Sequence, residues 1–360
     1  MKTAPLDNNG IPRARRLTLW QILLRYALPL AVSVGLCVYL FTKVDVAENL
    51  RIIRLYCDYR WVALALALSV LSHVIRAARW NIQLRALDVR VPFGSLVLSI
   101  FGTYSVNLVL PRLGEVWRTG YVATRAHAKF STVLGSMISD RLADTVMVAL
   151  LTLLTFVAAV FFTSTGTRII DILDLSGIRS TLSSPLMWVA IAAVVAVVAV
   201  ICTVFREHRA VKGARRVMAN VWSGFAVILK MKGKLRWVLL SLALWGCYFL
   251  QLYVTFYSFD FTRQVLHSYG LIAPMVCFVL SSISMALPSN GGYGPWQWAI
   301  ILGLGLYSAG VTIPHGTTFT DMSAAFANCV MTSQTVLLIL LGIITFVAIS
   351  LEKKSQSEKQ

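Results

Sequence analysis

Charged and backbone-breaking residues beside long apolar runs are the part of this sequence best suited to bind a ligand. One group of them follows an apolar run that ends near residue 110, and a second group opens the next long run. The two groups comprise Asn107, Pro111, Arg112, Gly114, Glu115, Arg118, Asp140, Arg141 and Asp144. Charged side chains at membrane depth are costly and usually serve a function. We therefore interpret both groups as one substrate-binding cluster.

The chemistry that this cluster favours is recognition of a phosphate. Asp140 and Asp144 are four residues apart, which predicts that both carboxylates lie on one helical face. Arg112, Arg118 and Arg141 can neutralise these carboxylates and the neighbouring glutamate. Because a guanidinium fork binds phosphate with two hydrogen bonds, we expect the arginines to hold a lipid phosphate. The carboxylates would balance them or receive an amino-bearing headgroup. The alternative is a structural network of ion pairs at the cytoplasmic interface.

A second candidate lies in the loop from Pro288 to Pro295, which contains Gly291, Gly292 and Gly294. Such residues free backbone N–H and C=O groups, which are tolerated in a membrane only when they are buried in protein or line a polar cavity. A short interrupted segment in each half of a chain indicates the substrate site of a transporter built from repeats. The halves share no residue-level similarity, so a repeat stays an open question, and a tight loop with close helix packing is the alternative.

Other chemistry-bearing residues receive simpler interpretations. Arg76, Arg79 and Trp80 read as basic anchors and an interfacial aromatic residue at a membrane surface. The five histidines are isolated, and neither a metal site nor a cofactor is expected. Motifs of nucleophilic hydrolases, ATP sites and dinucleotide sites are absent from the sequence, so transport would be downhill or ion-coupled. An enzyme built on the carboxylates of the first cluster remains a weak alternative.

The elements that must position these residues are predicted to be membrane-spanning helices. Of the 360 residues, 58% are hydrophobic and 13% are charged, which is far from the composition of a soluble domain. Apolar runs long enough to span a bilayer occupy 26–42, 61–78, 143–163, 186–205, 236–258, 269–287 and 324–350. Two shorter runs, 93–110 and 295–310, adjoin the Pro and Gly clusters. We expect an all-α polytopic bundle of about eight spans with re-entrant segments.

Basic residues predict how these helices are oriented. Segments on one side hold 26 of the 33 Lys and Arg residues and those on the other side hold 7, which predicts both termini in the cytoplasm. The same rule makes 93–110 enter and leave on the cytoplasmic side and makes 269–310 an out-in-out pair. The net charge of +18 thus reflects orientation and anionic lipid rather than nucleic acid. The inner membrane of a cell is the expected location.

The chain divides into one membrane domain with short polar ends. Residues 1–19 are a basic cytoplasmic N-terminus, 20–351 form the membrane domain, and 352–360 form a polar tail. Within the domain, 206–235 has the periodicity of a cytoplasmic amphipathic helix that links the two halves. The six cysteines are scattered singly, which indicates no disulfide framework.

The succession of motifs resembles one family. The motifs are Arg76-x-x-Arg79-Trp80, Phe93, Asn107, Pro111-Arg112-x-Gly114-Glu115-x-x-Arg118, Asp140-Arg141-x-x-Asp144 and Pro288-x-x-Gly291-Gly292-x-Gly294. From about Leu17 to Leu351 the chain is similar to the lysylphosphatidylglycerol synthase transmembrane family, also called flippase-like. The resemblance implies lipid translocation with these charged residues as the polar site. Two departures are Gln297, where an acidic residue is expected, and the lack of an aminoacyl-transfer domain after Leu351, so lipid synthesis is not expected.

The function that we predict is translocation of a phospholipid or a lipid-linked substrate. The expected partner is a membrane phospholipid with an anionic or aminoacylated headgroup. One rival is a membrane-embedded enzyme acting on lipid-linked sugars. Another is an accessory subunit that binds the proteins of envelope lipid or glycan synthesis.

Overall fold

The structure is a computed structural model that describes residues 46–110, 112–162, 231–287, 289 and 292–357. Several predictions fall outside these residues. They are the N-terminal segment 1–19, the spans 26–42 and 186–205, nearly all of the linker 206–235, the end of the tail, and the site residues Pro111, Pro288 and Gly291.

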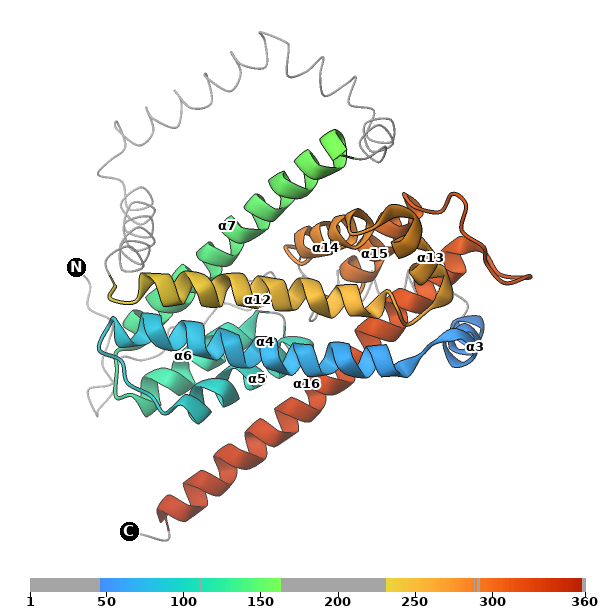
Figure 1. Cartoon of the computed structure of the whole chain (residues 1–360). Coiled ribbons are helices and arrows are strands. Elements are labelled where there is room, and N and C mark those ends of the chain that lie inside the picture. Colours follow the sequence, from blue (N-terminus) through green and yellow to red (C-terminus); the bar gives the residue numbers. More distant parts are fainter. Residues whose placement is uncertain (1–45, 111, 163–230, 288, 290–291, 358–360) are drawn as a thin grey trace, which may run out of the picture.

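The described residues form helices and turns without strands, as expected for an all-α protein. The helices are α3 (Val46–Tyr56), α4 (Tyr59–Arg85), α5 (Phe93–Val109), α6 (Leu113–Arg125), α7 (Phe130–Phe162), α12 (Lys234–Thr255), α13 (Asp260–Tyr269), α14 (Ile272–Ser284), α15 (Pro295–Gly305) and α16 (Phe319–Ser357). Figure 1 shows α4 and α12 side by side, with the longer α7 and α16 crossing beyond them.

Four of these helices, α4, α7, α12 and α16, are long and apolar enough to cross a membrane. A fifth crossing results if the bent pair α13 and α14 counts as one span. The predicted runs 61–78, 143–163, 236–258 and 324–350 fall within or largely within these four helices. The protein is therefore a multi-pass membrane protein, although the described residues do not establish the expected count of eight spans.

The run predicted as a span at 269–287 is a short helix that follows a sharp bend. Helix α14 has only 13 residues, and it is bent by 111° from α13. The bend occurs at Gly270, which ends α13 with a φ of 62°. At about 20 Å, α14 is too short to cross a hydrocarbon core of about 30 Å. The residues instead form the first arm of a hairpin with α15.

Two helical hairpins occupy matching places in the two halves. Helix α5 packs on α6, and α14 packs on α15. Exchanging α4 with α12, α5 with α14, α6 with α15 and α7 with α16 converts most contacts of the first half into contacts of the second. Thus α4 with α5 matches α12 with α14, α6 with α7 matches α15 with α16, and α5 with α16 matches α14 with α7. The contacts of α4 with α7 and α16 have no comparable counterpart at α12 among the described residues. The open question of a repeat is answered at the level of helix packing.

The two halves run in opposite directions. The amide of Asp58, at the start of α4, donates to the carbonyl of Ser258, just past the end of α12. Gly233, at the start of α12, lies beside Ile82 near the end of α4. Because each hairpin follows the end of its first long helix, the hairpins insert from opposite ends of the bundle (Figure 1). This is the arrangement of an inverted-topology repeat.

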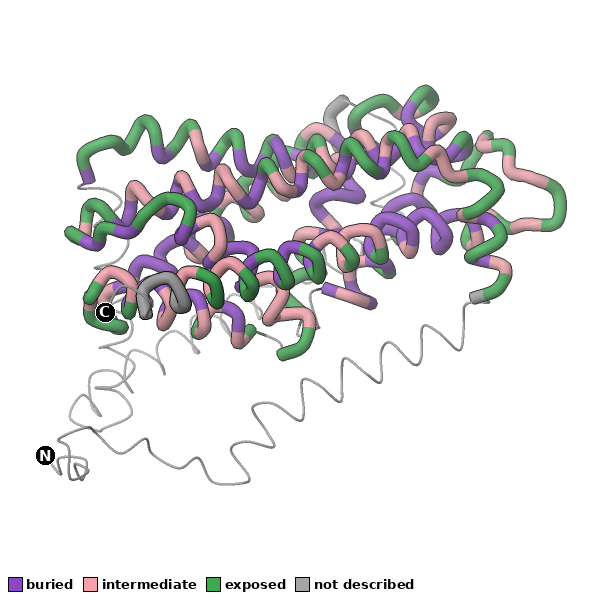
Figure 2. The backbone as a smooth tube through the Cα atoms, turned by 90° about the horizontal axis from the view of Figure 1, so that it is seen from below, coloured by how far each residue is buried: buried purple, intermediate pink, exposed green. Residues whose placement is uncertain are grey.

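The exterior of the bundle is apolar. Figure 2 shows exposed positions along the outer faces of the helices and buried positions where helices adjoin. The exposed residues on α12 and α16 include Leu239, Leu242, Ile343, Ile344 and Val347. A soluble protein rarely exposes so much contiguous apolar surface, so lipid is the natural solvent of these faces.

Candidate functional site: a charged network beneath the first hairpin

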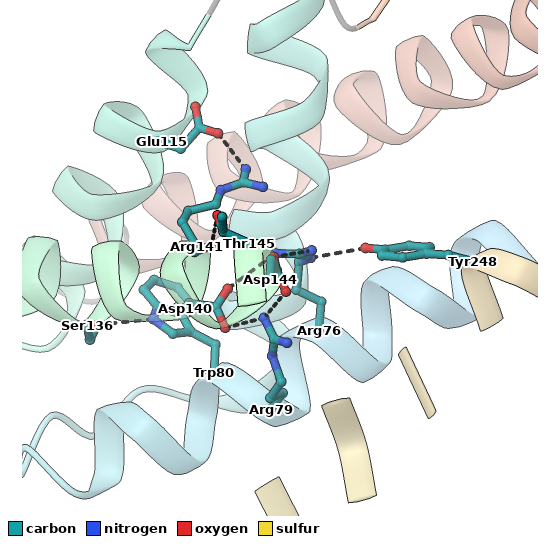
Figure 3. A network of polar contacts seen from close by, with 10 residues as sticks. All are labelled: Arg76, Arg79, Trp80, Glu115, Ser136, Asp140, Arg141, Asp144, Thr145 and Tyr248. Carbon is teal, nitrogen blue, oxygen red and sulfur yellow. Dashed lines mark hydrogen bonds and ion pairs between the residues drawn. The ribbon is translucent and has the colours of Figure 1, made fainter. Parts of the chain in front are cut away.

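Two arginines and two aspartates form the base of the site. Arg76 and Arg79 on α4 face Asp140 and Asp144 on α7 (Figure 3). Arg76 Nη1 and Nη2 lie 3.2 Å from Asp140 Oδ2 and 2.8 Å from Asp144 Oδ2. Arg79 Nη2 lies 2.6 Å from Asp140 Oδ1 and 2.8 Å from Asp144 Oδ1. Each carboxylate therefore bridges both guanidinium groups.

Helical spacing explains this geometry. Residues three and four apart on a helix project from the same face. The arginines are three apart on α4 and the aspartates are four apart on α7, so each pair presents both members to the other helix. The shared face of Asp140 and Asp144 was predicted correctly, whereas their partners were not. Arg76 and Arg79 are almost fully buried, so their interpretation as surface anchors was wrong.

Aromatic side chains close the base of the network. Tyr248 accepts a hydrogen bond of 3.2 Å from Arg76 Nε, and the guanidinium of Arg79 lies 5.7 Å from the centre of the Trp237 ring. The indole of Trp80 donates to Ser136 Oγ at 3.1 Å, and Trp80 itself is fully buried rather than interfacial. Ions removed from water this completely require close pairing, which the bridged arrangement supplies.

A second ion pair lies at the edge of the network. Arg141 Nη2 on α7 donates to Glu115 Oε1 in the first turn of α6. The side chain of Arg141 is 38% exposed and that of Glu115 is 17% exposed, whereas the basal aspartates and arginines are at most 12% exposed. Figure 3 shows this pair displaced to one side of the base. It is therefore the part of the network that an incoming group can reach.

Asn107 fixes Glu115 by joining the two arms of the first hairpin. Its Oδ1 accepts from the amide of Gly114 at 2.8 Å, and its Nδ2 donates to Glu115 Oε2 at 3.3 Å. The first amides of a helix lack partners within the helix, so this side chain satisfies one of them from the neighbouring arm. A Cβ on Gly114 would come within 2.1 Å of the carbonyl oxygen of Thr103, so the close approach of α5 and α6 depends on glycine.

Arg118 has no carboxylate partner among the described residues. It is 1% exposed, its guanidinium lies 4.3 Å from the centre of the Trp80 ring, and its Nε and Nη2 make no hydrogen bond. The prediction that Arg118 neutralises the aspartates was therefore wrong. Among the described residues, this cluster holds four arginines (Arg76, Arg79, Arg118 and Arg141) and three carboxylates (Glu115, Asp140 and Asp144), and Arg118 is the arginine without an ion pair.

Arg112 links the two hairpins instead of pairing with the carboxylates, which corrects its predicted role. It precedes α6 with a φ of 63°, a left-handed conformation that is uncommon outside glycine. Its Nη2 donates to the carbonyl of Ala286 at 3.0 Å, close to the end of α14. The turn of the first hairpin thus contacts the turn region of the second, although the two lie far apart in the sequence.

The second hairpin carries an uncharged counterpart of the Glu115 and Arg141 pair. Gln297 is the third residue of α15, as Glu115 is the third residue of α6. Gln297 Oε1 accepts from the amide of Gly294 at 2.6 Å, and its Nε2 donates to Asn328 Oδ1 on α16 at 2.8 Å. Asn328 Nδ2 in turn donates to Asn49 Oδ1 at 3.1 Å. Sequence reasoning had noted Gln297 only as a missing acid.

The backbone conformation of the second loop requires glycine at two positions. Gly292 and Gly294 have φ values of 90° and 92°, which side chains disfavour. A Cβ on Gly292 would also meet the sulfur of Met285 at 2.3 Å. These residues shape the turn before α15 and place the Gly294 amide on Gln297. Among the described residues, no group of three His, Cys, Asp or Glu side chains is arranged to hold a metal ion.

Comparison with known proteins is consistent with this architecture. Residues 26–332 match the family model described as the lysylphosphatidylglycerol synthase TM region. The chain belongs to this family. The expected membership is confirmed, and the matched range contains every residue of the charged network. The match to the family model therefore covers both hairpins and the four arginines of this chain.

The chain is also similar to a curated protein over a shorter stretch. A UPF0104 membrane protein of Pyrococcus horikoshii is 27% identical over 110 residues, which are 28% of this chain and 32% of that protein. The alignment therefore spans about a third of the relative's length. No solved structure matches the chain.

Proposed function

We propose that this protein moves a phospholipid between the leaflets of a cell membrane. The observation that carries the proposal is the partly exposed pair of Glu115 and Arg141 above a buried network whose described residues include one more arginine than carboxylates. An anionic headgroup supplies the missing negative charge. Its phosphate replaces Glu115 as the partner of Arg141, since arginine binds phosphate in the same forked geometry as a carboxylate.

The hairpins provide a path for such a headgroup. They insert from opposite ends of the bundle, and their turns meet where Arg112 donates to Ala286. Inverted repeats in transporters let one half rock against the other around a central site. A headgroup would leave the charged pair of the first hairpin and pass to the amides of the second, while the acyl chains remain along the apolar outer faces.

The arrangement fits a phospholipid best. Its headgroup carries a phosphate and, in aminoacylated lipids, also an amine. Arg141 suits the phosphate, and the freed carboxylate of Glu115 suits an ammonium group. The family's name, which refers to lysylphosphatidylglycerol synthesis, supports a phospholipid of the anionic or aminoacylated kind. We place the protein in the inner membrane of a cell with both termini in the cytoplasm, on the basis of the basic flanks.

The ion pairing disfavours acid and base catalysis at this site. Asp140 and Asp144 each bridge two arginines, and Glu115 pairs with a third. The oxygens of these carboxylates are occupied as hydrogen-bond acceptors of the arginines. The observed contacts therefore favour binding over an enzymatic role.

Leaflet exchange in proteoliposomes tests the proposal. Labelled anionic, aminoacylated and neutral lipids are offered to the wild type, Arg141→Ala, Glu115→Ala and Arg112→Ala. Arg51→Ala is the matched control, because Arg51 belongs to an exposed ion pair with Glu48 on α3. Since loss of a charged hydrogen bond costs about 1.5–3 kcal/mol, we expect Arg141→Ala to slow exchange of the anionic and aminoacylated lipids about tenfold or more, and Glu115→Ala to slow that of the aminoacylated lipid similarly.

The outcomes separate the rival functions. Exchange that the site variants slow and the control leaves unchanged supports translocation. A change in the mass of an offered lipid would instead identify a membrane enzyme. Intact lipids with no exchange in any preparation would contradict translocation and favour an accessory role in envelope synthesis.

A further inference from the structure

Two cysteines that are far apart in the sequence meet in the structure. Cys57 lies in the connection between α3 and α4, and Cys329 lies in α16, 272 positions later. Their Sγ atoms are 3.6 Å apart. A disulfide requires about 2.05 Å, so the sulfurs must approach each other by roughly 1.5 Å to bond. The scattered cysteines had suggested no disulfide, because sequence spacing carries no information about this contact.

We propose that Cys57 and Cys329 form a disulfide that ties α3 to α16 at the outer end of the bundle. Cys57 is partly exposed, so a soluble or membrane-bound oxidant can reach it, whereas Cys329 is buried beside it. The remaining described cysteines do not compete for this bond. Cys247 donates to the carbonyl of Leu68, and Cys277 is buried against Gly303.

The side of the membrane favours oxidation. The connection that holds Cys57 lies beside the end of α12, as the bond between Asp58 and Ser258 shows. The basic segments gather at the opposite end, where α4 ends at Arg85 and α12 begins at Lys234. With the basic end in the cytoplasm, the cysteine pair faces the outside, where thiols escape the cytosolic reductants.

The bond forms by thiol–disulfide exchange with a disulfide-bearing oxidant. The Cys57 thiolate attacks one sulfur of the oxidant's disulfide and gives a mixed disulfide and one released thiolate. The Cys329 thiolate then attacks the Cys57 sulfur and releases the second thiolate of the oxidant. Two protein thiols lose two protons and two electrons, and the oxidant's disulfide becomes a dithiol that takes up both.

The disulfide would fasten the interface that supports the second hairpin. Cys329 follows Asn328, whose side chain donates to Asn49 on α3 and accepts from Gln297 on α15. A covalent bond between α3 and α16 holds Asn49 and Asn328 together. It thereby fixes the series of hydrogen bonds that runs through these side-chain amides and ends at the backbone amide of Gly294. The bond also closes a very long loop, which lowers the entropy of the unfolded chain.

Thiol trapping in intact cells tests the inference. Cells that produce the full chain are treated with N-ethylmaleimide before lysis, and the purified protein is digested without reductant and analysed by mass spectrometry. We expect a linked peptide pair containing Cys57 and Cys329, which separates on addition of dithiothreitol. Cys247→Ser is the control and should retain the linked pair. In Cys57→Ser, Cys329 should become available to maleimide after denaturation.

Thermal unfolding provides a second test that does not depend on detecting the linked peptides. Dithiothreitol should lower the apparent melting temperature of the wild type by several degrees and leave that of Cys57→Ser unchanged. The inference is overturned if Cys57 and Cys329 both carry maleimide in the trapped wild type, or if Cys57 is linked to a different cysteine. Neither test requires lipid exchange, so the result stands apart from that of the transport proposal.

Discussion

The environment of Arg118 indicates whether the buried network serves to bind a ligand or to stabilise the fold. Its guanidinium is buried against Trp80, and two of its nitrogens make no hydrogen bond. A structural role would favour a counter-ion at this position, because an unpaired buried charge is costly. We infer that the residue is retained for an anion that arrives with the substrate.

Replacing Arg118 with methionine should therefore stabilise the protein while impairing transport. The substitution removes an uncompensated buried charge and keeps an unbranched apolar side chain, which should increase the free energy of unfolding by roughly 1–3 kcal/mol. Lipid exchange should fall because the excess positive charge is lost. Thermal unfolding in detergent and the exchange assay measure the two effects. A variant that is less stable yet transports normally would show that Arg118 is structural.

Among individual residues, the sequence predicted the aspartates of the network but not the arginines that pair with them. The spacing of Asp140 and Asp144 was sufficient to place both carboxylates on one face. The arginines that pair with them were misassigned, because a basic residue near the cytoplasmic end of a span has the same signature whether it faces lipid headgroups or a neighbouring helix. Only the position of α7 beside α4 distinguishes Arg76 and Arg79 from anchors.

The elements that matter most are the two hairpins. Their existence was predictable, since proline and glycine interrupt short apolar runs at both places. The length of α14 was not, because the apolar run 269–287 extends beyond both ends of the helix and resembles a full span. The match between Glu115 and Gln297 also escaped sequence reasoning, because the halves align in helix packing and not in residue identity.

Substitution of Gly114 tests how closely the arms of the first hairpin must approach. A Cβ on Gly114 would meet the carbonyl oxygen of Thr103, so Gly114→Ala should destabilise the protein by roughly 1–3 kcal/mol. It should also disturb Glu115 and slow exchange. Gly120→Ala in the same helix is the control, because no atom lies within 4 Å of the added methyl group. Equal melting temperatures for both variants would contradict the close packing of α5 and α6.

Gln297 offers a test of the correspondence between the hairpins. Gln297→Glu keeps the acceptor for the Gly294 amide. If the side-chain amides of Asn328 and Asn49 both turn over, Asn328 donates to the new carboxylate and Asn49 donates to Asn328. The variant should fold, but it places a negative charge where the first hairpin has Glu115. We expect slower exchange of anionic lipids relative to neutral ones in a mixed-lipid assay. An unchanged preference would argue against passage of the headgroup beside the second hairpin.

For the whole molecule, the arrangement that supports transport is the meeting of two oppositely inserted hairpins. Membership of the family supports a membrane function, whereas the orientation with both termini in the cytoplasm stays a prediction from the count of basic residues. The contact between Arg112 and Ala286 could not be predicted, because it joins segments from different halves and depends on how the halves pack. The proposed transport requires both halves to separate at this contact so that a headgroup can pass.

Linking the two hairpin turns is the most direct test of this account. Arg112→Cys and Ala286→Cys, combined with Cys57→Ser and Cys329→Ser, are joined by a reducible bifunctional linker about as long as an arginine side chain. We expect the linked protein to lose the lipid exchange that the same variant shows without the linker, and to regain that rate when dithiothreitol cleaves the linker, because the proposed transport requires the hairpin turns to part. Exchange at the same rate in the linked and cleaved protein would contradict a path between the hairpins.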